Sequence, residues 1–198
     1  VCSSDLYAPF MSEATPDASL TVNALTNQST EENVKSSDFL LMKATVDPEQ
    51  DLTADGKLKI SLNHAMSKLI IKITVNGTTD ASMSKLGDMA INGAVVNATC
   101  DLSAAAPVVV PAADAVVATV APYKGTESCE CILPPQKIAE GFSVNFSYDG
   151  KLYIWTAKEA IELEKGVEHT LTLNVNTTVR LAAKVARNWA TGQLIDRN

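Results

Sequence analysis

A β-hairpin that can be placed to the residue is the feature that most constrains the fold of this chain. Between residues 142 and 148 apolar side chains occupy the even positions and polar side chains the odd ones, which indicates a strand with one buried face. Asp149-Gly150 follows, and this pair favours a two-residue type I′ loop. That loop fixes a register that gathers aromatic side chains on one face: Tyr148 opposite Lys151, Phe146 opposite Tyr153 and Val144 opposite Trp155.

The same two-residue period recurs in shorter runs along the chain. Alternating strands are predicted at 57–62, 69–75 and 171–175, with Asn76-Gly77 as the turn that ends the second run. Weaker strands are expected at 90–96, 116–120 and 129–133, and Pro134-Pro135 must end the last of these because proline cannot donate to a ladder. Many short strands between turn residues predict an all-β sandwich.

Two segments fit more than one structure. Residues 78–88 could form one or two helical turns that end at Gly87. The segment 179–189 fits both periods. As a helix it has Gly192 beyond it as a C-cap, and its alanines favour that choice. As a strand, it places on one face Val179, Leu181, Ala183, Val185 and Trp189.

Composition limits the partners and the domain organisation. The 198 residues carry a formal net charge of -7, with basic residues scattered singly, which excludes a nucleic-acid partner. No apolar run approaches the roughly 18 residues of a membrane helix. A polar connection between Thr45 and Lys57 predicts a boundary between residues 1–50, part of a first domain, and residues 57–198, a complete second domain.

Residues with catalytic or metal-binding chemistry are sparse. The two histidines, His64 and His169, lack the spacing of a catalytic triad or a zinc site, and no phosphate-binding loop is present. We therefore predict no enzymatic activity and no cofactor. Cys100 with Cys129 or Cys131 is a candidate disulfide in an oxidising compartment, although buried free thiols are the preferred interpretation.

Seven segments, in order, resemble motifs of the fimbrillin family of Bacteroidales, whose members build type V pili or decorate the cell surface. The most specific is Leu62-Asn-His-Ala-Met-Ser-Lys-Leu69, which is similar to the family's "F-HALSKL" stretch. The others are residues 6–10, 27–44 (which contains Asn27-Gln-Ser-Thr), 132–136 (Ile-Leu-Pro-Pro-Gln), 148–155 (Tyr-Asp-Gly-Lys-Leu-Tyr-Ile-Trp), 166–176 and 189–192.

The resemblance implies tandem transthyretin-like β-sandwich domains, the first partial and the second complete. It also implies a lipoprotein of the cell surface or outer membrane, with its signal and lipid anchor upstream of Val1, and other fimbrial subunits as partners. Subunits of such a protein would assemble by β-strand exchange, and the resemblance favours the strand for residues 179–189 as the candidate donor. The alternative is a monomeric surface adhesin that binds glycan or host protein, with Tyr123, Tyr153 or Trp155 stacking on sugars.

Overall fold

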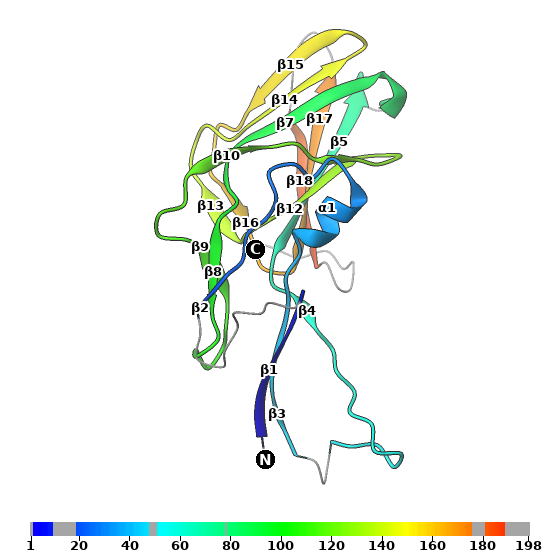
Figure 1. The fold of residues 1–198 in the computed structure, drawn as a ribbon. Helices are drawn as coiled ribbons and strands as arrows, with labels where there is room; N and C mark the ends of the chain where they lie inside the picture. The colour runs from blue at the N-terminus through cyan, green and yellow to red at the C-terminus, as the bar shows by residue number, and fades with distance from the viewer. Residues whose placement is uncertain (1, 10–18, 48–50, 78, 176–180, 189–198) are drawn as a thin grey trace.

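Two β-sheets form the body of the protein in the computed structural model, which describes residues 2–9, 19–47, 51–77, 79–175 and 181–188 (Figure 1). The larger sheet has the order β11-β12-β5-β17-β18, with β6 pairing the end of β5. Its strands are β11 (Tyr123–Lys124), β12 (Cys129–Leu133), β5 (Ser67–Val75), β6 (Thr79–Asp80), β17 (Val167–Val175) and β18 (Leu181–Asn188). The second sheet has the order β10-β7-β14-β15, from β10 (Val117–Val120), β7 (Leu86–Val95), β14 (Ser143–Tyr148) and β15 (Lys151–Thr156). The all-β prediction is confirmed.

Smaller elements complete the chain. A three-stranded sheet contains β2 (Ser19–Thr21), β8 (Ala98–Asp101) and β9 (Val109–Pro111), and a two-stranded one contains β13 (Gln136–Ile138) and β16 (Ile161–Leu163). Another three-stranded sheet contains β1 (Cys2–Ala8), β3 (Leu40–Val46) and β4 (Asn63–His64). The described helical elements are α1 (Glu31–Ser36) and the 3₁₀ turn η1 (Met83–Lys85).

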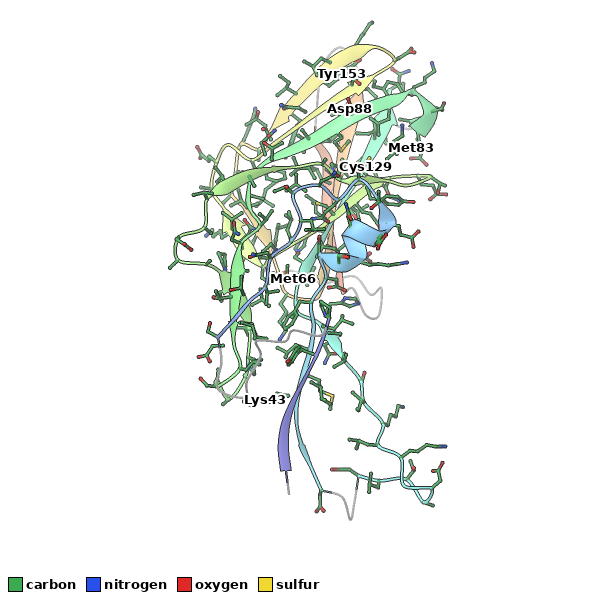
Figure 2. All side chains as sticks on the ribbon, viewed as in Figure 1. Lys43, Met66, Met83, Asp88, Cys129 and Tyr153 are labelled. Carbon is green, nitrogen blue, oxygen red and sulfur yellow. The ribbon has the colours of Figure 1, made fainter. Side chains whose placement is uncertain are left out.

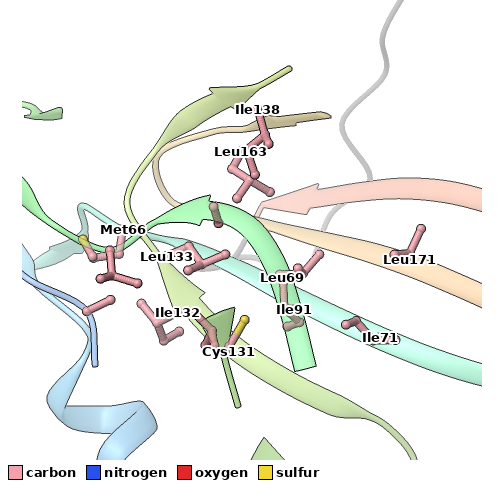
Figure 3. Packing of buried hydrophobic residues seen from close by; sticks show 14 of the residues in the cluster. Met66, Leu69, Ile71, Ile91, Cys131, Ile132, Leu133, Ile138, Leu163 and Leu171 are labelled. Carbon is pink, nitrogen blue, oxygen red and sulfur yellow. The ribbon is translucent and has the colours of Figure 1, made fainter. Parts of the chain in front are cut away.

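The core lies between the two large sheets because their strands alternate in the way the sequence predicts. Leu69 and Ile71 of β5, Leu171 of β17 and Ile91 of β7 belong to one buried cluster, in which Leu69 lies beside Ile91 (Figure 3). All of these side chains are buried. The pairing of β5 with β17 is parallel, whereas the other strand ladders are antiparallel.

The predicted hairpin is confirmed in register. Tyr148 lies opposite Lys151, Phe146 opposite Tyr153 and Val144 opposite Trp155. Both loop residues have positive φ, 52° at Asp149 and 76° at Gly150, as a type I′ turn requires. The rings of Phe146 and Tyr153 stack with their centroids 5.4 Å apart.

One sequence prediction is wrong, and another is correct only in part. Residues 57–62 form no strand. Leu58 makes only an isolated bridge to Leu52, and Ile60 is 48% exposed, because no neighbouring strand buries the apolar face of this run. The helical turns expected between residues 78 and 88 are present in the described residues only as one 3₁₀ turn, and Gly87 lies in a strand rather than at a helix end. The 3₁₀ turn η1 covers three residues, and β7 already begins at Leu86, four residues before the predicted start, since β14 extends alongside it.

The N-terminal residues pack onto the body. β2 pairs with β8, and Leu20, Val22 and Phe39 belong to the same buried cluster as Leu69. β1 and β3 form a ribbon that extends away from the sheets (Figure 1). The Nζ of Lys43, labelled in Figure 2, ties this ribbon to the body by donating to two carbonyls of the 101–104 region. The division into residues 1–50 and 57–198 stays a prediction, and these contacts define the interface that the two parts would share.

Candidate functional site: the β17–β18 edge

The segment with two sequence interpretations forms a strand. β18 runs antiparallel to β17, from Val167 opposite Asn188 to Leu173 opposite Leu181, with one irregularity between Thr172 and Leu173. Among the described strands β17 is its sole neighbour, so β18 forms one edge of the larger sheet. Tertiary pairing therefore overrides the helix propensity of its alanines.

Only part of the candidate donor set can be placed. Leu181, Ala183 and Val185 lie on β18, where Ala183 is opposite Thr172 and Val185 opposite Thr170. Val179 and Trp189 lie outside the described residues.

β17 can pair with a strand on the side that β18 covers, from Val167 to Leu173. Its side chains alternate between buried and half-buried from Val167 to Val175, so one face belongs to the core. β5 covers one side of its backbone in parallel, and β18 covers the other. If β18 left, the β17 backbone from Val167 to Leu173 would present unpaired N–H and C=O groups beside an apolar face, which is the arrangement that attracts another strand.

The family-like stretch around His64 and Lys68 makes polar contacts that sequence reasoning did not foresee. His64 Nδ1 lies 2.7 Å from Asp38 Oδ2. Burial raises the pKa of the Asp38 carboxyl above its ordinary value, and the neighbouring His64 opposes this shift. Lys68 Nζ lies 2.8 Å from Glu130 on β12 and 3.7 Å from Glu168 on β17, so one lysine bridges three adjacent strands of the larger sheet.

Gln28 is a buried anchor that the sequence did not single out as such. Its side chain is 0% exposed, and its Nε2 donates to the carbonyl oxygens of Leu25 and Ile132 at 2.8 Å. Its Oε1 accepts from the Ile132 N–H, also at 2.8 Å. The amide thus pairs with the β12 backbone as a neighbouring strand would. The available signal was its place in the family-like Asn27-Gln-Ser motif.

Gln136 repeats this arrangement on the other sheet. Its Oε1 accepts from the Val95 N–H, and its Nε2 donates to the Val95 carbonyl, both at 2.9 Å. Two glutamine amides therefore extend the two large sheets where no backbone strand continues the ladder.

The second histidine and the aromatic residues of the adhesin alternative lie against the core. His169 is 1% exposed, and its Nε2 accepts from the Glu164 N–H at 3.0 Å. Trp155 is buried, and Tyr123 and Tyr153 are partly buried against the core, so none of the three rings is fully exposed for stacking on a sugar. No cluster of three metal-binding side chains occurs among the described residues. Within the same residues no helix is both long and apolar enough to span a bilayer.

The cysteines of the core are buried. Cys129 and Cys131 lie two residues apart on β12, point to the same buried face and carry free thiols. Burial raises the pKa of the Cys129 thiol to about 11 and that of Cys131 further. Cys100 is buried on β8, in a different sheet. No disulfide joins Cys100 to Cys129 in this structure, and its formation in an oxidising compartment stays a prediction.

Comparison with known proteins shows that other solved structures share this architecture. It shares its fold with a candidate cell adhesion protein from Bacteroides uniformis, with a TM-score of 0.71 and 17% identity over 94% of this chain and 72% of that one. A candidate cell adhesion protein from Bacteroides ovatus gives a TM-score of 0.65 and 15% identity over 99% of this chain and 69% of that one. A search of curated proteins finds no match.

These similarities define the fold, an all-β architecture that occurs in solved proteins of Bacteroides. The family model described as fimbrillin-like matches residues 5–189, so the chain belongs to the fimbrillin-like family. The resemblance carried by the seven sequence motifs is confirmed.

Proposed function

We propose that this protein is a structural subunit, or an accessory or anchor subunit, of a bacterial surface fimbria. Family membership supports a place among other fimbrial subunits at the cell surface. The chemistry of the described residues supports a structural role, since the histidines and charged side chains at the sheet are engaged in contacts within the fold. An outer-membrane location through an upstream lipid anchor is part of the same proposal.

The mode of assembly we propose is exchange of β18. The observation that carries it is the position of β18 as an edge strand, with β17 as its sole described neighbour. If the β18 of one subunit replaced that of the next, the same ladder would form between two chains in the same register. Such a swap makes no new contacts and has a low energetic cost.

The test is a gel of the full-length protein, matured by brief trypsin treatment and run in SDS without heating. A ladder that collapses on boiling, and is absent when residues 179–198 are deleted, is the expected result. A control replaces Leu52 and Ile60 by serine, because these are exposed apolar residues outside the strands of both large sheets. A single monomer band for the unaltered protein would contradict assembly by exchange. The remaining hypothesis would then be a monomeric adhesin. Binding of that monomer to a glycan array would test it.

A further inference from the structure

β15 differs from the other edge strands of the two large sheets. It pairs with β14 without interruption over all six of its residues, and its one charged side chain is Lys151 at its start. Figure 1 shows it along the outside of its sheet. By contrast, β11 has two residues, β10 has a bulge between Ala118 and Thr119, and the β17–β18 ladder is also irregular.

Two of the three outward side chains of β15 are apolar, and the third is Thr156. Leu152 is 71% exposed and Ile154 is 58% exposed, whereas Tyr153 and Trp155 point into the sandwich. Natural edge strands usually carry charges, prolines or bulges that prevent pairing with another chain. β15 has none of these in its middle, and therefore its edge is suited to accept a strand.

The backbone groups that face the free edge can be assigned. In a two-residue hairpin the residues flanking the loop, Tyr148 and Lys151, exchange hydrogen bonds, and bonded positions then recur at every second residue. The N–H of Ala157 donates to the Phe142 carbonyl at 2.8 Å, which confirms that the odd-numbered residues face β14. Leu152 and Ile154 therefore direct their N–H and C=O groups away from β14.

We propose that β15 pairs antiparallel with β15 of a second copy. The two-fold axis lies midway between the Tyr153 residues of the two copies, which are opposite each other. A dyad perpendicular to the sheet keeps the outer faces of both copies on the same side. In this register Leu152 of each copy lies opposite Ile154 of the other, and each pair exchanges its backbone hydrogen bonds. Each apolar side chain thus meets an apolar partner, and two four-stranded sheets become one continuous sheet.

This contact is independent of the proposed exchange of β18, which lies in the other sheet. It would join subunits side by side, through a patch that is the same on both copies. It therefore goes beyond the proposed function, and the two can fail separately.

The test compares two charge variants of the full chain by sedimentation velocity over a range of concentrations. Leu152→Lys with Ile154→Lys places like charges opposite each other at both pairs. Leu152→Lys with Ile154→Glu places opposite charges there. Both variants alter the same two exposed positions, so circular dichroism and thermal melting should report equal folding.

We expect the unaltered protein to form a concentration-dependent dimer, the Lys/Lys variant to be monomeric, and the Lys/Glu variant to dimerise in a salt-sensitive way. A monomer at every concentration for the unaltered protein would overturn the proposal. So would a dimer that survives unchanged in the Lys/Lys variant.

A cross-linking measurement fixes the register and does not depend on those variants. With cysteines at both Leu152 and Ile154, a mild oxidant should link two copies covalently, because directly opposite residues lie about 5.5 Å apart between Cα atoms. Neither single cysteine variant should cross-link. Efficient cross-linking of Ile154→Cys alone would mean a dyad at residue 154 and would overturn the register we propose.

Discussion

Replacement of Gln28 by leucine should destabilise the protein more than any other change to a single polar side chain near the N-terminus. The change removes three hydrogen bonds, all of 2.8 Å, from a side chain that is 0% exposed. It also leaves the N–H and C=O of Ile132 and the carbonyl of Leu25 without their side-chain partner. Leucine has a similar volume, so the loss reports the hydrogen bonds rather than a cavity.

The magnitude follows from the number of groups left unpaired. A net contribution of about 1–1.5 kcal/mol per hydrogen bond, with a further penalty for buried groups that remain unsatisfied, gives roughly 3–5 kcal/mol. For a chain of this length that loss lowers the melting temperature by roughly 8–15 °C. Urea unfolding followed by circular dichroism measures it directly.

Two matched variants separate this explanation from others. Gln28→Asn keeps the amide but shortens its reach, so we expect a loss close to that of leucine. Asn27→Leu changes the adjacent, exposed residue and should alter stability by less than about 1 kcal/mol. If Gln28→Leu unfolds within about 1 kcal/mol of the unaltered protein, the amide does not hold the N-terminal segment to β12, and the reasoning is refuted.

Three further predictions concern the body of the sandwich. Gly93→Ala should cost about 2–3 kcal/mol in urea unfolding, because Gly93 has a φ of 96° and a Cβ would lie 3.1 Å from the backbone just before β14; an unchanged midpoint would contradict this. A double-mutant cycle of Lys68→Met with Glu130→Gln should give a coupling of about 1 kcal/mol, larger than the same cycle with Glu168→Gln, since the two ion pairs measure 2.8 Å and 3.7 Å; equal couplings would argue against the geometry. The raised pKa of Cys129, about 11 against an ordinary 9.0, predicts stability that is fully present below pH 9 and is lost as pH rises from 9 toward 11. Cys129→Ala should make that loss less steep without abolishing it, because the pKa of the Cys131 thiol is raised further and Cys131 contributes over the same range. An equally steep loss in the variant would exclude Cys129 as a cause.

Local chemistry explains what the sequence could predict. The hairpin of β14 and β15 was correct to the residue because a two-residue loop sets the register of both strands. The prediction of β12 was also correct at both ends. Its C-terminal end is explained by Pro134-Pro135, because proline cannot donate to the ladder. In each case the deciding residues lie within a few positions of the element they define.

Partners distant in the chain explain what it could not. Residues 57–62 show the same alternation as true strands, but no neighbour covers them. The parallel pairing of β5 with β17 joins segments about a hundred residues apart, and Gln28 meets Ile132 across a separation of 104 residues. The burial of the Gln28 amide depends on the backbone of Ile132, and the residues around Gln28 give no indication of that partner.

The most direct test of the central proposal asks whether β18 of one subunit pairs with β17 of another. Thr170 and Val185 are direct partners across this ladder, so cysteines at these two positions can form a disulfide. One preparation should carry Thr170→Cys alone and the other Val185→Cys alone, mixed during maturation under mild oxidation. Strand exchange predicts a covalent dimer of the two different variants, in a yield that neither variant reaches alone. If the mixture gives no such dimer while the double variant in one chain closes internally, β18 stays within its own subunit and the account of assembly is contradicted.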